Sequence, residues 1–201
     1  MEQITINLYK FDELSEEAKK VAIEHERNYR QTDGEPLMFF RELCEDKAKE
    51  HGFEIDNRGL TYSLSYSQGD GLSFSGDYLE TEKLLNEVLG QGKEKTAKLL
   101  TENCTLIIKQ NRGHYCYASK SDVDLYLENY TSSINVINTN NIDIVVSKVL
   151  NIIEDKYMAL CKELERIGYA EIEWYSSDET IIEELQNRDS KYTEDGKIYE
   201  Y

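Results

Sequence analysis

The clearest hydrophobic pattern in the chain has a period of two and covers residues 60–67. Every second position there is Leu or Tyr, and the positions between are Thr or Ser. This alternation is typical of an antiparallel strand that buries one face and leaves the other polar. Ser67-Gln68-Gly69-Asp70-Gly71 then predicts a turn, and alternation resumes over residues 72–75. Shorter apolar runs predict further strands over residues 4–8, 106–108 and 115–127.

Helical periodicity dominates the rest of the chain. It predicts a helix from Ser15 to about Tyr29, a second opened by Pro36, and one or two helices over residues 80–102. The longest apolar stripe covers residues 142–167, where Gly168 is expected to end the helix. A last helix over 177–187 and a hairpin turned at Asp195-Gly196 close an acidic tail, residues 170–201. We therefore expect one α+β domain over residues 1–201, an antiparallel sheet packed against several helices including one long helix.

The charge balance narrows the function classes. Forty acidic residues against 23 basic ones give a net charge of −17. Such a surface repels a phosphate backbone on average, which argues against general nucleic-acid binding. Two interpretations remain open: an ordinary acidic protein, or one that presents carboxylates to a basic partner. With no long apolar run and no secretory leader pattern, we expect no membrane association and a cytoplasmic location.

The four cysteines and three histidines do not form a metal-binding pattern. They are widely scattered, without the closely spaced pairs that zinc sites show. We therefore expect no metal and no cofactor, and we interpret the cysteines as small buried apolar residues. The sequence also lacks phosphate-binding loops, nucleophile elbows and H-E-x-x-H motifs, so it gives no support to the well-marked enzyme classes.

One segment reverses the local charge. Residues 103–121 contain no acidic residue, whereas they contain bases and a histidine. If the strands pair, one sheet edge would gather a nucleic-acid- or anion-binding set: Ser67, Gln68, Ser73, Lys109, Arg112 and Tyr115. His114 and Asp70 would be the catalytic pair of an RNase-like site there, as general acid and base. The alternative interpretation is purely structural, since Q-G-D-G is also a good turn sequence.

Four blocks of sequence carry a resemblance. They are YKFDELSEEAKKVAIEH, YSLSYSQGDGLSFSG, GHYCYASKSDVDL and YSSDETIIEELQNRDSKYTEDGKIY, in this order. The chain resembles small acidic phage and prophage proteins with an S-Q-G-D-G-[AL]-S-F signature. That resemblance implies an origin in a mobile element and a profile similar to anti-defence proteins such as anti-CRISPR inhibitors.

Two functions from different classes follow as hypotheses. The first is an anti-CRISPR inhibitor that binds a basic surface of a host nuclease or Cas effector complex. Its acidic surface would lie in the tail, on Glu171, Glu173, Asp178, Glu179, Glu183 and Glu184. The second is a nucleic-acid enzyme that damages guide RNA through the His114/Asp70 region. The long helix and the tyrosine-rich sheet would also suit a dimer, although neither requires one.

Overall fold

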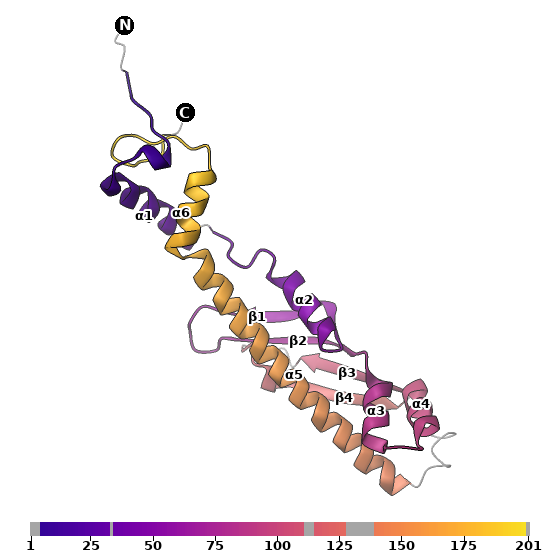
Figure 1. Cartoon of the computed structure of the whole chain (residues 1–201). Helices are drawn as coiled ribbons and strands as arrows, with labels where there is room; N and C mark the ends of the chain where they lie inside the picture. The colour runs from indigo at the N-terminus through magenta and orange to yellow at the C-terminus, as the bar shows by residue number, and fades with distance from the viewer. Residues whose placement is uncertain (1–4, 33, 111–114, 128–138, 200–201) are drawn as a thin grey trace. The chain divides into compact units, whose positions relative to one another are not determined.

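The structure, a computed structural model, describes residues 5–32, 34–110, 115–127 and 139–199. The helices and strands follow the order α1 (Glu16–Thr32), α2 (Phe40–Glu50), β1 (Phe53–Ser63), β2 (Gly71–Tyr78), α3 (Thr81–Leu89), α4 (Glu94–Asn103), β3 (Cys104–Gln110), β4 (Ser121–Leu127), α5 (Thr139–Tyr175) and α6 (Asp178–Asn187). The predicted α+β class, with an antiparallel sheet and one long helix, is confirmed (Figure 1).

The chain divides into two compact units. One, the terminal unit, combines residues 1–38 and 169–201, and the other, the sheet unit, is residues 39–168. Helix α5 passes from the sheet unit into the terminal unit. That residues 1–201 behave as one domain stays a prediction. Among the described helices, none has both the length and the apolar character needed to cross a membrane.

The sheet is an antiparallel meander with the order β1-β2-β3-β4. Its inner face is apolar because alternate residues of each strand point to one side. Phe53 is paired with Tyr78 across the β1–β2 ladder, and Phe74 is packed edge-on against Tyr157 of α5. Helix α5 crosses this side of the strands in Figure 1 and buries Val149, Ile153, Tyr157, Leu160 and Leu164. These positions recur every three or four residues, which gives one continuous apolar stripe.

Strand β1 begins earlier than its alternation predicts. The sequence indicates a strand from Leu60, but the observed strand starts at Phe53, directly after Gly52 ends the α2 turn at φ +81°. The register with β2 shifts between Ile55 and Leu60. This bulge interrupts the period of two, so the short alternation Phe53-Glu54-Ile55-Asp56 is out of step with that of residues 60–67 and does not extend it in sequence.

Other boundaries also differ from the sequence prediction. The strand predicted over residues 115–127 begins only at Ser121. Residues 36–39 form a turn, so the second helix begins at Phe40 and not at Pro36. The long helix does not end at Gly168 but continues to Tyr175. Gly168 is buried where Leu64 and the Phe40 ring approach the helix, and an added Cβ would lie 2.8 Å from Phe40 Cζ. This glycine therefore allows close packing and does not terminate the helix.

Gly168→Ala is expected to destabilise the sheet unit by about 1 kcal/mol. Overpacking costs about 1 to 3 kcal/mol, and the better helix propensity of alanine offsets about 1 kcal/mol of it. Chemical unfolding followed by circular dichroism measures the change. Adding Phe40→Leu should recover part of the loss by making room, and an equally destabilised double variant would contradict this packing argument.

The terminal unit has a small core of its own. Phe11, Ala18 and Ala22 pack with Ile181 and Leu185 of α6 and with Tyr192. The predicted hairpin at Asp195-Gly196 is present, since Thr193 N–H donates to Lys197 O at 2.9 Å. The opening strand predicted over residues 4–8 is wrong in the part that the structure describes, because residues 5–8 form no strand. The next residue, Tyr9, makes a single bridge to Tyr192.

Candidate functional site

The S-Q-G-D-G turn is organised around the carboxylate of Asp70. It accepts hydrogen bonds from the backbone N–H groups of Ser65 at 2.7 Å and Ser67 at 3.0 Å. It also accepts from the hydroxyls of Ser63, Ser65 and Ser67 at 2.9 to 3.1 Å. Hydrogen bonds to an ionised acceptor are stronger than neutral ones. The loop between β1 and β2 is therefore held in one conformation by a single side chain.

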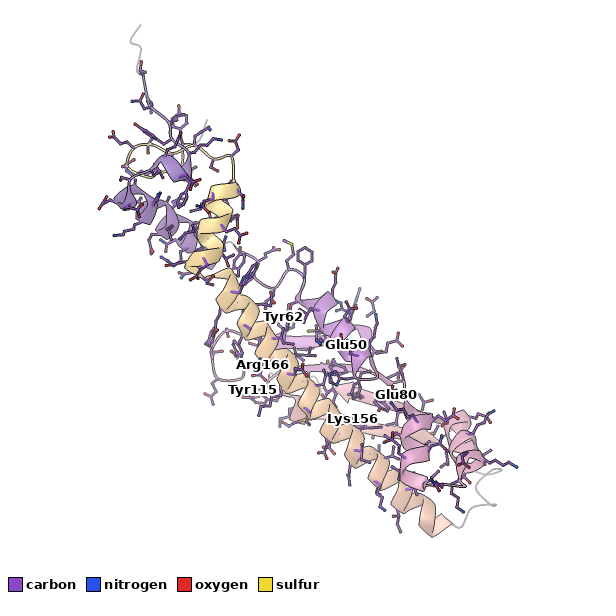
Figure 2. All side chains as sticks on the ribbon, in the orientation of Figure 1. Glu50, Tyr62, Glu80, Tyr115, Lys156 and Arg166 are labelled. Carbon is purple, nitrogen blue, oxygen red and sulfur yellow. The ribbon has the colours of Figure 1, made fainter. Side chains whose placement is uncertain are left out.

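The two glycines of the turn make room for a pair of tyrosines. Tyr115 packs on Gly69, where an added Cβ would lie 2.7 Å from Tyr115 Cδ1. Tyr117 packs on Gly71 in the same way, at 3.1 Å. The rings of Tyr115 and Tyr117 stack on each other, with centroids 5.4 Å apart and planes 10° apart. The turn and the Tyr115–Tyr117 segment thus form one structure. Tyr115 is labelled in Figure 2.

The predicted binding set is only partly gathered. Ser67, Asp70 and Tyr115 lie together, with Gln68 exposed in the same loop. Ser73 is buried and accepts a hydrogen bond from Gln110 Nε2 at 3.1 Å. Lys109 Nζ lies 3.6 Å from Asp124 Oδ2, and it is paired with Asp122 across the β3–β4 ladder. The carboxylates of β4 therefore offset the positive charge of Lys109. Arg112 and His114 lie outside the described residues.

The outer face of the sheet, which points away from α5, is acidic. Glu54 is paired with Asp77 across β1 and β2, while Asp122 and Asp124 project from β4 on the same side as Lys109. Asp56 accepts a hydrogen bond from Ser75 at 2.9 Å on this side. Burial, together with the nearby carboxylates of Asp56 and Glu54, raises the pKa of Asp77. We call this surface the outer sheet face and define it by Glu54, Asp56, Asp77, Asp122 and Asp124.

Sequence reasoning missed two cavities of the sheet unit. A groove of about 440 Å³ is lined by Leu72, Tyr117, Met158, Ala159, Lys162 and Glu165. A polar pocket of about 330 Å³ lies at the end of α2 and is lined by Glu50, His51, Glu80, Lys83, Lys156 and Glu163, of which Figure 2 labels three. Both are assembled from residues of distant segments. No local pattern could have found them, although the exposed Met158 interrupts the polar side of the long helix.

Most of the charged side chains that line the polar pocket already have a partner. His51 Nε2 lies 3.7 Å from Glu163 Oε2, and Lys83 Nζ lies 3.2 Å from Glu80 Oε2. Lys156 Nζ donates to Tyr78 Oη at 2.8 Å and lies 5.3 Å from the centre of the Tyr78 ring. Within the described ranges no group of three or more potential metal ligands comes together.

The thiols are poorly suited to nucleophilic chemistry. Burial raises the pKa of Cys44 and of Cys161 to about 12. It also raises the pKa of Cys104, and burial together with the Asp70 carboxylate raises that of Cys116. Because the thiolate is the nucleophile, all four side chains are weak nucleophiles near neutral pH.

Some carboxylates of the acidic tail take part in ion pairs within the terminal unit. Asp178 is paired with Arg27, and Glu184 is paired with both Arg30 and Arg188. Glu173, Glu179 and Glu183 are exposed, and Glu171 is half-buried. Of the six acids that the sequence groups as one partner surface, Asp178 and Glu184 therefore take part in ion pairs that stabilise the fold.

Asp70→Ala is expected to loosen the loop between β1 and β2. Because this carboxylate accepts several charge-assisted hydrogen bonds, its loss should cost about 2 kcal/mol. Amide hydrogen exchange at Ser65 and Ser67 should then accelerate at least about tenfold. Ser67→Ala, which removes one of the donors, serves as the milder control. Unchanged exchange in Asp70→Ala would mean that the loop is held by other contacts.

Asp77→Asn is expected to stabilise the protein at pH 7 by about 0.5 kcal/mol, since like charges directly opposite on a sheet are destabilising. The raised pKa of Asp77 means that the folded chain binds this proton more tightly than the unfolded chain does. Asp77 therefore destabilises the folded chain increasingly as the pH rises above the ordinary pKa range of aspartate. The stability gained by Asp77→Asn should vanish at about pH 3, where the carboxyl is protonated in both the folded and the unfolded chain. Urea unfolding at both pH values measures this. Asp122→Asn, opposite Lys109, should give no such gain.

Comparison with known proteins identifies a family of unknown function. The curated proteins and the solved structures contain no match to the chain. Residues 38–180 match the family described as "Domain of unknown function (DUF8835)", a range that includes the whole sheet unit. Because the match covers more than half of the 201 residues, the chain belongs to the DUF8835 family.

Proposed function

We propose that this protein is a non-enzymatic inhibitor that places its outer sheet face on a basic surface of a host defence nuclease or effector complex, with anti-CRISPR activity as the specific form. The observation that carries the proposal is the acidic outer sheet face. Its charge agrees with the net charge of −17. A basic groove that normally holds nucleic acid is the complementary kind of surface.

The spacing of the carboxylates supports this role. Residues two apart on a strand are separated by about 6.6 Å, and neighbouring strands lie about 4.8 Å apart. These separations are below the screening length of about 8 Å at physiological salt, so the carboxylates act on a partner together. A sheet also holds them in place, which lowers the entropy lost on binding. Two basic residues, Arg58 and Lys109, accompany them on the four strands.

The test replaces all five outer-sheet-face acids by their amides. Binding to a guide-loaded Cas effector complex, measured as a function of salt, should lose at least about tenfold in association rate and much of its salt dependence. The matched control makes the same change in net charge in the terminal unit, by amide substitution of Glu171, Glu173, Glu179, Glu183 and Glu194. It should retain most of the binding.

The outcomes distinguish the two acidic surfaces. Loss only in the control variant would transfer the interface to the tail, as the sequence hypothesis has it. Equal, modest loss in both variants would mean that net charge alone attracts the partner, and unchanged binding in both would overturn the proposal. Folding of each variant is checked first by circular dichroism, because the substitutions remove charge repulsion as well as partner contacts.

The RNase hypothesis is tested in the same samples. Its remaining structural support is that Tyr115 lies beside the Asp70 loop, where an aromatic ring can stack on a base. Against it, Asp70 is already engaged with three serines. Intact guide RNA after incubation favours the inhibitor. Shortened RNA that becomes intact with His114→Ala would establish the enzyme.

A further inference from the structure

We propose that the groove between the Tyr117 segment and helix α5 binds an arginine side chain of the basic partner. This inference rests on the proposed function, because it takes the partner to be basic. The groove lies on the α5 side of the sheet, so a partner that also contacts the outer sheet face has to extend around the edge of the sheet, and the arginine contact is a second, separate anchor. A few well-packed anchors usually supply most of the energy of an interface, and arginine is prominent among them.

The lining of the groove suits a long side chain with an apolar stem and a cationic end. Leu72, Met158 and Ala159 supply apolar walls on which methylene groups can lie. Tyr117 supplies an aromatic ring on which a guanidinium group can stack. The groove volume of about 440 Å³ also lies within the usual range of ligand sites, about 300 to 1,000 Å³.

The tyrosine wall is fixed before any ligand arrives. Tyr117 is stacked on Tyr115, which in turn packs on Gly69 of the Asp70-centred loop. Tyr66, in the same loop, has a left-handed backbone conformation at φ 56° and an exposed ring. Non-glycine residues adopt this conformation at a cost, and such strain concentrates at functional sites. The S-Q-G-D-G turn therefore helps to position the tyrosine wall of the groove.

The field of the whole molecule favours a cation from the partner at the groove. Glu165 lines the groove, and within the described part of the chain neither its carboxylate nor the Lys162 ammonium group makes an ion pair. Lys162 is the opposing charge in the same lining. The net charge of −17 raises the local concentration of cations around the whole molecule. A cationic ligand that pairs with Glu165 is therefore favoured over an anionic ligand that pairs with Lys162. Arginine satisfies both the carboxylate and the aromatic wall, whereas an acidic side chain would satisfy only Lys162.

Methionine NMR gives a reporter inside the groove. The chain has three methionines, and Met158 is the one among the lining residues, so Met1 and Met38 serve as internal references. The ¹³C-methyl-labelled full chain is titrated with acetyl-Ala-Arg-Ala-amide and with the matched norleucine and glutamate peptides. The arginine peptide should shift the Met158 methyl signal with a Kd on the order of 1 mM. The other two peptides should bind at least about threefold more weakly.

Two substitutions of opposite sign make the assignment specific. Glu165→Gln should weaken arginine-peptide binding about two- to fivefold, whereas Lys162→Gln should strengthen it by a similar factor. Tyr117→Leu should weaken it about two- to fivefold by removing the aromatic wall. Equal binding of the norleucine peptide, with no effect of either charge substitution, would mean an apolar occupant. The reverse order of charge effects would mean an anionic one. Either result, or no shift of Met158 at all, overturns the proposal.

Failure of the groove proposal is separable from failure of the proposed function. If the arginine peptide binds the groove but neutralising the outer sheet face leaves effector binding unchanged, the inhibitor proposal fails and the arginine site stands. If effector binding depends on the outer sheet face but the arginine peptide leaves Met158 unshifted, the inhibitor proposal stands and the groove assignment fails.

Discussion

Arg30→Met should destabilise the terminal unit by about 3 kcal/mol, because it removes a buried cation and leaves the carboxylates of Glu26 and Glu184 to share the one guanidinium group of Arg188. Arg30 and Glu26 are both almost fully buried, with side chains 2% and 3% exposed. The guanidinium donates to Glu26 Oε1 at 3.4 Å, to Glu184 and to the Tyr175 carbonyl. It also lies 4.7 Å from the centre of the Tyr175 ring. The substitution removes all of these contacts at once.

Amide hydrogen exchange in α1 and α6 measures this loss in the terminal unit alone. Trp174 belongs to the same unit, but its side chain is already 61% exposed, so its fluorescence would change little on unfolding. Arg27→Met is the matched control, since Arg27 pairs with Glu24 and Asp178 at the surface and should cost less than about 1 kcal/mol. Adding Glu26→Met to Arg30→Met should recover part of the loss. Equal losses of unfolding free energy in Arg27→Met and Arg30→Met would show that burial does not increase the contribution of the Arg30 contacts to stability.

Tyr157→Phe should cost the sheet unit about 2 to 3 kcal/mol, because it orphans buried backbone groups. The hydroxyl accepts from Phe74 N–H at 3.0 Å and donates to Phe74 O at 2.9 Å. The β2–β3 register pairs Gly76 with Ile108 and Asp77 with Ile107, so Phe74 lies beyond this ladder. The tyrosine hydroxyl takes the place of a neighbouring strand for that residue. Burial raises the pKa of Tyr157, so the hydroxyl keeps its proton at neutral pH.

The same atomic change at Tyr192 provides the control. The Tyr192 side chain is fully buried, and its hydroxyl makes no hydrogen bond of normal geometry within the described structure, although the Ser190 side chain lies close enough to act on its pKa. Tyr192→Phe should therefore change the free energy of unfolding by less than about 0.5 kcal/mol, or increase it, since no bonded partner is orphaned. Chemical unfolding of both variants compares them directly. Similar losses in the two would mean that ring packing, and not the hydroxyl, determines the cost.

Part of the candidate site could be predicted from local sequence. The S-Q-G-D-G turn is visible because glycine and aspartate have specific turn chemistry. The hydrogen-bond donors to Asp70 could not be predicted in the same way. Ser63 and Ser65 belong to the preceding alternation and look like an ordinary polar strand face. The stacking of Tyr115 on Tyr117 depends on how that segment meets the two glycines, which local periodicity does not report.

The charged surfaces show the same limit. A count along the chain gives residues 103–121 a positive charge, but the β3–β4 register places Lys109 between Asp122 and Asp124. The acidic tail looks like a uniform surface in sequence, whereas Asp178 and Glu184 are paired with arginines of α1 and of the segment after α6. Charge in sequence is local, but the field at a surface depends on which strands and helices become neighbours.

Local sequence predicts the α+β class, the long helix, the last helix over residues 177–187 and the two glycine turns, because each depends on periodicity or on the conformational preference of a few adjacent residues. The tertiary structure alone creates the acidic outer sheet face, the buried Arg30–Glu26 pair and the groove beside Tyr117. It also decided that Gly168 is a packing position and not a helix end. Each of these requires residues distant in sequence to meet, and that meeting is determined by strand register and by the packing of α5.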